Sequence, residues 1–255
     1  MSDVVRQRRG IYLLPNLLTT ANLFSGFYAI VSVMSANYVR AAIAILVAIV
    51  FDSLDGLIAR YTKSSSRFGR EYDSLADLIS FGVAPGLLIY TWALNGYGRL
   101  GWVAAFLFVA CGALRLARYN VQEASADGRY FTGLPIPAAA GLVATIVLLD
   151  EHILRLGKEV RPGVILCMVF LLALLMVSPL RYRAFKALRL PGWRPFELLV
   201  GSVVGLFIFV LFPQVVAFAC FAGYALSGVV GWPLRAVARR LKKPPARSET
   251  EELKL

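Results

Sequence analysis

The chain has 255 residues, of which 58% are hydrophobic and only 16% are charged. A soluble domain is typically about 25% charged, so the composition excludes an ordinary soluble protein and indicates one embedded among membrane lipids. The net charge of +12 would suit nucleic-acid binding. However, the basic residues collect in short segments between apolar runs, as in the cytoplasmic loops of membrane proteins. We therefore expect no nucleic-acid partner.

Apolar runs long enough to cross a bilayer follow one another along the chain. A spanning helix needs about 20 mostly apolar residues, and by that measure we predict eight, six of which stand apart as separate runs. They cover 15–35, 39–60, 72–95, 100–120, 134–151, 162–178, 197–212 and 214–233. Only Phe212-Pro213-Gln214 separates the last two, which form either a tight hairpin or one broken re-entrant unit. The predicted fold class is all-α, a polytopic transmembrane helical bundle.

The distribution of basic residues predicts the orientation. If the N-terminus is cytoplasmic, all but five of the 27 Lys and Arg residues fall in cytoplasmic segments, and both termini lie in the cytoplasm. The five on the opposite side are Arg40, Arg99, Arg155, Lys158 and Arg161. We expect the protein in the cell (inner) membrane. Residues 1–233 would form the membrane domain, and 234–255 a basic cytoplasmic tail whose end is disordered.

Four aspartates gather at the predicted cytoplasmic ends of the second and third helices. Asp52 and Asp55 are three residues apart, and Asp73 and Asp77 are four apart, so each pair shares one helix face. The short polar loop 61–68 would fold the two helices into a hairpin that brings the pairs together. An ionised carboxylate in a membrane helix costs about 2.5–3.5 kcal/mol, and four together repel one another. Such a cluster is stable when a hard divalent cation, Mg²⁺ or Mn²⁺, lies among the oxygens.

Small residues and an arginine flank the aspartates. Gly56 and Ala59 share one helix face and leave a shallow groove, where a ring or a phosphate can approach the backbone. Arg60 offers a fork of donors suited to phosphate, and Gly69 precedes Asp73 by four residues. Tight helix packing through small residues would also account for the glycines, but the neighbouring aspartates favour a binding groove.

The aspartates could instead have a structural role or a role in transport. They could pair with Arg60, Arg67 and Arg70 in a structural salt-bridge network, although this accounts for only one or two carboxylates. They could also line the path of a divalent-cation or lipid transporter, but such charges usually lie nearer the bilayer midplane. We therefore favour a catalytic site over both.

The complete pattern, D-x2-D-G-x2-A-R-x8-G-x3-D-x3-D, runs from Asp52 to Asp77. It resembles the signature of the CDP-alcohol phosphatidyltransferases, integral membrane enzymes of phospholipid synthesis. The resemblance implies that a hydroxyl group attacks the lipid-linked phosphate of CDP-diacylglycerol and releases CMP. It also implies Mg²⁺ or Mn²⁺ as cofactor, with two ions per site, a homodimer, and a catalytic core over about 13–178.

The same resemblance implies roles for the residues of the pattern. Asp52, Asp55 and Asp73 would be metal ligands, and Asp77 would be the general base and a further ligand. The residues in contact with CDP-diacylglycerol would be Gly56, Ala59, Arg60 and Gly69.

Further segments indicate the acceptor. "LPNLLTTANLFSGF", "DSLADLISFGVAP", "ALRLARYN" and "FTGLPIPAAAG" resemble members of the family that use L-serine, which would give phosphatidylserine and CMP. Glycerol 3-phosphate is the alternative acceptor, followed by inositol phosphate and choline. The predicted topology places these segments at the same cytoplasmic mouth as the aspartates. We predict that Asn16, Thr19 and Asn22 line the nucleotide pocket and that Arg115, Arg118 and Asn120 bind a phosphate or the serine carboxylate.

Overall fold

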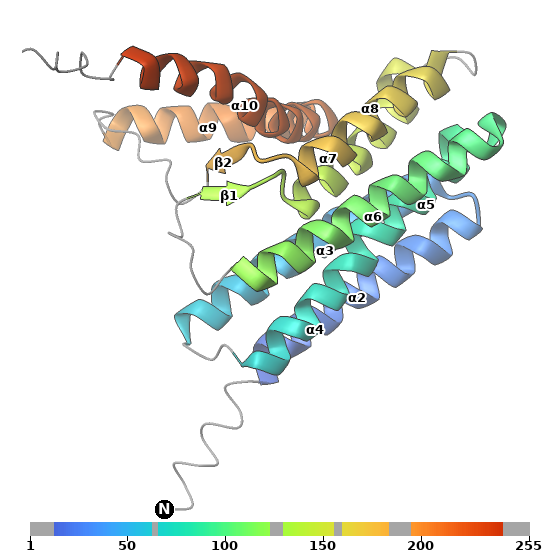
Figure 1. Cartoon of the computed structure of the whole chain (residues 1–255), viewed down its shortest axis with the longest axis horizontal. Helices are drawn as coiled ribbons and strands as arrows, with labels where there is room; N and C mark the ends of the chain where they lie inside the picture. Colours follow the sequence, from blue (N-terminus) through green and yellow to red (C-terminus); the bar gives the residue numbers. More distant parts are fainter. Residues whose placement is uncertain (1–12, 63–65, 123–129, 156–159, 184–194, 242–255) are drawn as a thin grey trace, which may run out of the picture.

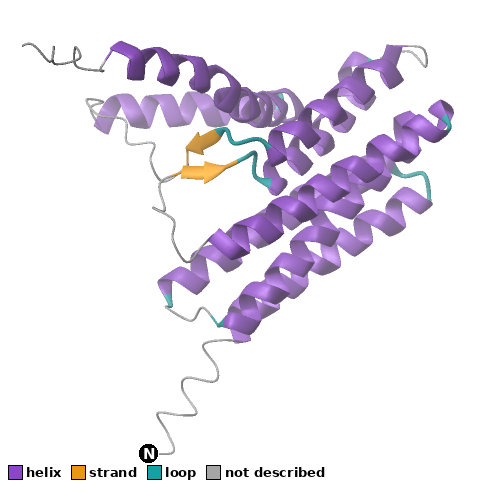
Figure 2. Cartoon of the chain, viewed as in Figure 1, coloured by secondary structure: helices purple, strands orange, loops and turns teal. Residues whose placement is uncertain are grey.

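The computed structural model describes residues 13–62, 66–122, 130–155, 160–183 and 195–241, which are mostly helical, with short connecting loops and one two-stranded ribbon (Figures 1 and 2). The α-helices are α2 (Leu13–Met34), α3 (Tyr38–Tyr61), α4 (Arg67–Asp77), α5 (Ala84–Ile89), α6 (Arg99–Gln122), α7 (Ile136–Leu149), α8 (Val160–Val177), α9 (Pro195–Leu211) and α10 (Pro213–Leu241). The other helical turns are η1 (Leu78–Val83), η2 (Tyr90–Leu94), η3 (Asn95–Tyr97) and η5 (Asp150–Leu154), and the strands are β1 (Tyr130–Thr132) and β2 (Arg181–Arg183).

Several helices are long and apolar enough to cross a membrane. Among the described residues, five stretches qualify: Leu13–Met34, Tyr38–Tyr61, Arg67–Tyr97, Arg99–Val121 and Ile136–Leu154. The segments Leu199–Leu211 and Pro213–Val229 are bent by 116° and form a sixth span if they cross as one unit, while Pro162–Val177 is shorter. The helical class is therefore confirmed, with the small ribbon as an unpredicted addition. The count of eight spans and the cytoplasmic location of both termini stay predictions.

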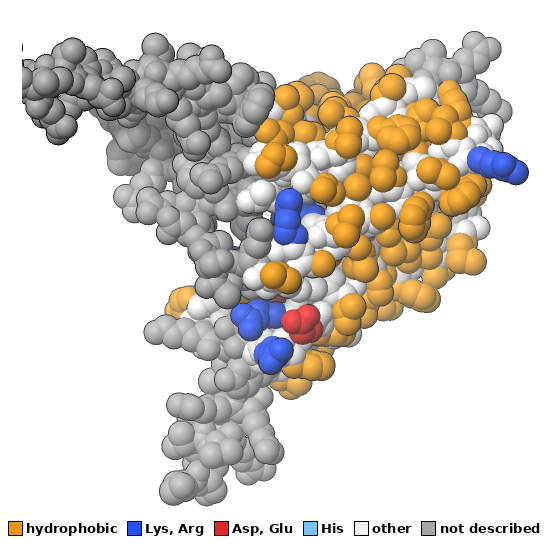
Figure 3. Space-filling view, viewed as in Figure 1, with side chains coloured by type: hydrophobic (Ala, Val, Ile, Leu, Met, Phe, Trp, Pro, Cys, Tyr) orange, Lys and Arg blue, Asp and Glu red, His pale blue; other side chains and the backbone are white. Residues whose placement is uncertain are grey.

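The surface has the distribution expected of a membrane protein. Figure 3 shows a broad apolar area over the elongated helices, with charged side chains at its two ends. Exposed large apolar residues occur on α2, α3, α6, α8, α9 and α10. The predicted tail lies partly in α10, and its end, 242–255, lies outside the described residues.

Helices α2 and α3 pack along their length, and the helix formed by α4, η1 and α5 lies against α2 (Figure 1). The two helices approach closely at Gly26, where an added Cβ would clash with the side chain and the Cα of Ser80. The Ser80 hydroxyl donates to the backbone carbonyl of Asn22 at 3.0 Å. Small residues allow such close contact between membrane helices, and here the contact lies beside the cluster of aspartates.

The third predicted span is not a regular α-helix. Immediately after Asp77 it widens into the π-helical turn η1, where the N–H of Ala84 donates to the carbonyl of Ile79. Pro85 follows, and its ring would collide with the carbonyl of Phe81 in a regular α-helix. The wider turn accommodates this proline, and turns of this kind are frequent at functional sites.

The ribbon links the last helices to α6. β1 and β2 are antiparallel, with Phe131 opposite Tyr182. The Arg118 guanidinium on α6 donates to the carbonyls of Val177 and Thr132, both at 3.1 Å. Tyr182 is fully buried, and its hydroxyl donates to the Ala225 carbonyl of α10 at 3.1 Å. The ends of α6 and α8, the ribbon and α10 therefore form one connected unit.

Candidate active site

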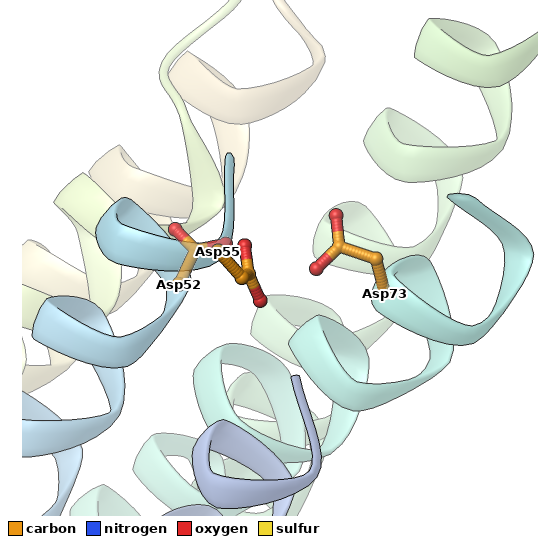
Figure 4. A group of neighbouring side chains, drawn as sticks. All are labelled: Asp52, Asp55 and Asp73. Atoms are coloured by element: carbon orange, nitrogen blue, oxygen red, sulfur yellow. The ribbon is translucent and has the colours of Figure 1, made fainter. Parts of the chain in front are cut away.

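The carboxylates predicted to meet do so. Asp52 and Asp55 project from α3 toward Asp73 on α4 (Figure 4), and one oxygen from each lies within 4.8 Å of the others. Asp55 is only 4% exposed, and Oδ1 of Asp73 is buried without a hydrogen-bond partner among the described residues. Buried acceptors are normally satisfied, and three convergent carboxylates suit a hard divalent cation. The arrangement therefore fits a metal ion.

Asp77 lies beside this group rather than within it. It is buried at the end of α4, and the Asn22 side-chain amide donates to its Oδ1 at 3.0 Å. Asp77 also interacts electrostatically with Asp52 and Asp73. Ionised carboxylates that lie close together repel one another, and a bound cation offsets this repulsion. Asp77 is thus oriented by α2 and coupled to the group of three.

Helix α2 supplies neutral hydrogen-bonding groups to the acidic ones. Thr19 and Asn22, three residues apart, share one face of the helix. The Thr19 hydroxyl donates to Oδ2 of Asp55 at 2.9 Å and lies 3.1 Å from the Pro15 carbonyl. Thr19 and Asn22 are buried, so these contacts fix the orientation of Asp55 and Asp77 from the opposite side of the site.

A cavity of about 80 Å³ opens next to the carboxylates. It is lined by Pro15, Asn16, Thr19, Asp55, Gly56, Ala59, Ser66, Gly69, Arg70 and Asp73. Five of the residues predicted to contact the donor are among them. Arg60 is exposed at the end of α3 but acts electrostatically on Asp52, whereas Asn22 lies deeper, against Asp77.

The two glycines of the pattern differ in their surroundings. A Cβ added at Gly56 would meet nothing within 4 Å, so this position leaves space in the cavity. A Cβ at Gly69 would lie 3.0 Å from the Ser66 hydroxyl and 3.2 Å from Oδ1 of Asn16. Gly56 therefore keeps the cavity open, and Gly69 permits close packing of α2 against the start of α4.

Ser66 and Arg70 line the cavity although the sequence pattern did not single them out as site residues. Ser66 caps α4, its hydroxyl accepting from the backbone N–H of Gly69 at 2.9 Å. Serine is a favoured N-cap residue, so the run of serines before Arg67 could have predicted that α4 begins there. Arg70 directly follows Gly69, and its place in the wall depends on the turn that Ser66 begins.

The three predicted acceptor residues have different surroundings. Arg115 is only 7% exposed and acts electrostatically on Asp52 and Asp77. The Asn120 amide nitrogen donates to the hydroxyl of Ser74, the residue after Asp73, at 2.9 Å. The Arg118 guanidinium is directed to backbone carbonyls of the ribbon and α8. The structure thus places Arg115 near the carboxylates, Asn120 at their edge and Arg118 in the scaffold.

Comparisons with known proteins agree with this geometry. The family model described as CDP-alcohol phosphatidyltransferase matches residues 12–180. A CDP-diacylglycerol–serine O-phosphatidyltransferase of Helicobacter pylori is 39% identical over 226 residues, which cover 87% of this chain and 92% of the relative. An archaetidylserine synthase of Methanothermobacter thermautotrophicus is 39% identical over 66% of this chain and 69% of its own. A CDP-diacylglycerol–serine O-phosphatidyltransferase of Methanocaldococcus jannaschii is 35% identical over 68% of this chain and 75% of its own.

Proposed function

The chain belongs to the CDP-alcohol phosphatidyltransferase family, and on this premise we propose that it transfers the phosphatidyl group of CDP-diacylglycerol to L-serine. The products would be phosphatidylserine and CMP. The observation that carries the proposal is the convergence of Asp52, Asp55 and Asp73 beside Asp77. The choice of serine is supported by the names of the relatives, which specify serine products or serine as acceptor.

Asp52, Asp55 and Asp73 would hold Mg²⁺ or Mn²⁺, and we propose two ions with Asp77 as a further ligand. The buried, unpartnered Oδ1 of Asp73 supports this assignment. Bound cations would neutralise charge on the donor pyrophosphate and on the departing CMP.

The cavity beside the carboxylates would take part of the CDP group. Gly56 and Ala59 leave the backbone of α3 accessible there, and Asn16 and Thr19 form the facing wall on α2. Arg60 at the rim would donate to a phosphate, since a guanidinium presents several donors in a fixed plane. Gly69 would act by keeping the start of α4 close to α2.

Asp77 would be the general base. A serine hydroxyl is a weak nucleophile until a positioned base removes its proton. As the hydroxyl oxygen bonds to phosphorus, Asp77 would accept that proton, and the bond from phosphorus to the CMP oxygen would break. Asn22 supports this role, because its amide fixes one carboxylate oxygen of Asp77. We propose direct displacement, without a phosphatidyl-enzyme intermediate.

Arg115, Asn120 and Arg118 complete the proposed acceptor end. Arg115 would pair with the serine carboxylate. Asn120 would help to position α4 through its hydrogen bond to Ser74. Arg118, which fastens the ribbon, would act as a positioning residue for that end of the site.

We further propose that the protein is a homodimer in the cell membrane, with this site facing the cytoplasm. The excess of Lys and Arg in the segments predicted to be cytoplasmic supports the orientation. We retain 1–233 as the membrane domain, about 13–178 as its catalytic core, and 234–255 as a basic tail.

The test is CMP release by the purified protein with CDP-diacylglycerol and Mg²⁺ or Mn²⁺. L-serine, glycerol 3-phosphate, inositol phosphate and choline are offered separately, and the lipid product is identified. Serine-dependent CMP together with phosphatidylserine supports the proposal. CMP with another alcohol instead overturns the serine assignment, and CMP with none of them, in a folded protein that binds metal, supports a transporter.

A further inference from the structure

An arginine is buried close to the base without a complete set of partners. Arg115 is 7% exposed, and its Nε has no hydrogen-bond partner among the described residues. Leaving a buried charged donor unsatisfied is costly, so such a group indicates a site for an anionic ligand. Arg115 interacts electrostatically with Asp77, the proposed base. We therefore expect the anion to belong to the acceptor, whose hydroxyl must lie beside Asp77.

Helix α10 contributes a side chain, Tyr224, to the surroundings of Arg115. This helix lies outside residues 12–180, the part of the chain that the family model matches. Tyr224 on this helix interacts electrostatically with Arg115, as does Tyr119, one turn beyond Arg115 on α6. Tyr224 is partly buried. A phenol hydroxyl is a hydrogen-bond donor that can serve a carboxylate together with a guanidinium.

Tyr224 is held in position by the ribbon. Its ring lies against that of Tyr182, with centroids 5.6 Å apart and planes inclined by 40°. The Tyr182 hydroxyl is bonded to the carbonyl of Ala225, the residue after Tyr224. An added Cβ at Gly228 would clash with the Tyr182 ring, so this glycine lets the ring lie directly on α10. The position of Tyr224 is therefore fixed before any ligand binds.

We propose that Arg115 and Tyr224 together form the subsite for the acceptor carboxylate, and that α10 thereby takes part in acceptor selection. Arg115 pairs with the carboxylate, and the Tyr224 hydroxyl donates a hydrogen bond to it. The inference rests on the proposed function, because the ligand is an alcohol that carries a carboxylate. A cationic alcohol such as choline is disfavoured by the charge of Arg115, and an alcohol without a carboxylate offers the buried Nε of Arg115 no anionic acceptor.

Steady-state kinetics of Tyr224→Phe test this subsite. We expect the KM for L-serine to rise at least about tenfold, the effect of removing one hydrogen bond to a charged group, with the KM for CDP-diacylglycerol unchanged. Tyr38→Phe is the control, because it also removes a tyrosine hydroxyl, one that donates to the Thr91 carbonyl at 3.4 Å and lies at the opposite end of α3 from Asp52 and Asp55. It should leave the ratio of the two KM values unchanged.

A second measurement uses the wild-type protein alone. L-serinamide keeps the reacting hydroxyl and lacks the carboxylate, so its KM should exceed that of L-serine by at least about tenfold. Equal KM values for the two acceptors, or a Tyr224→Phe variant with an unchanged KM for serine, overturn the subsite while leaving the proposed function intact. A wild-type protein that makes no CMP with serine overturns both.

Discussion

Replacing Gly56 by alanine should separate the stability of the protein from its activity. Gly56 lies inside α3, and a Cβ there would meet nothing within 4 Å. Glycine within a helix is less stable than alanine by about 0.5–1 kcal/mol. Because no packing in the described structure requires glycine here, Gly56→Ala should stabilise the fold by about that amount and raise Tm by about 1–4 °C.

The same methyl group should impair catalysis. Gly56 lines a cavity of only about 80 Å³, next to Asp55, so a methyl group there takes space that we assign to the CDP group. A displacement of about 1 Å in a reacting group can lower the rate about 100-fold. We therefore expect kcat/KM for CDP-diacylglycerol to fall by about 10- to 100-fold.

The assay is CMP release at varied CDP-diacylglycerol, with thermal unfolding of the same preparation in detergent. Gly205→Ala on α9 is the control, since that glycine also has nothing within 4 Å and does not line the cavity. It should raise Tm similarly and leave kcat/KM unchanged. A Gly56→Ala variant that is more stable and fully active would refute the assignment of the groove to the donor.

Three further changes test other parts of the site. Asp73→Asn should weaken Mn²⁺ binding at least about tenfold, measured by electron paramagnetic resonance, because it removes one charge from the group of three. Thr19→Val should lower kcat about tenfold by releasing Asp55, whereas Thr20→Val, an exposed hydroxyl change on the same helix, should not. Burial raises the pKa of Tyr182 from its ordinary value of 10.0 to about 12, because the folded protein favours the neutral phenol. The contribution of this phenol to the free energy of unfolding is therefore complete below pH 10 and is lost as the pH rises toward 12. Wild-type Tm should therefore fall more steeply over that interval than Tm of Tyr182→Phe.

The acidic part of the site could be predicted because its geometry is mostly local. The spacing of Asp52 and Asp55 fixes their common face once α3 is a helix, and the short connection to Asp73 leaves few ways to arrange the next helix. Thr19 and Asn22 share a face for the same reason, although their individual partners, Asp55 and Asp77, appear only when α2 is packed.

The acceptor end depends on contacts between distant segments, which residue spacing does not specify. Arg118 looks like a ligand-binding residue in sequence, yet its guanidinium bonds to carbonyls of Thr132 and Val177. Tyr224 carries no distinctive motif, and its relation to Arg115 depends on the packing of α10 against α7 and β2. The break between α9 and α10 was visible at Pro213, but residue spacing does not give its angle of 116°.

The central claim is that Asp77 activates the serine hydroxyl while the neighbouring aspartates bind the cation. The most direct test measures CMP release and Mn²⁺ binding together, for the wild type and for Asp77→Asn, with CDP-diacylglycerol and L-serine. We predict serine-dependent CMP from the wild type and a loss of at least about 100-fold in Asp77→Asn, which should still bind Mn²⁺ through the other three carboxylates. An Asp77→Asn variant that binds Mn²⁺ and releases CMP at the wild-type rate would contradict this mechanism.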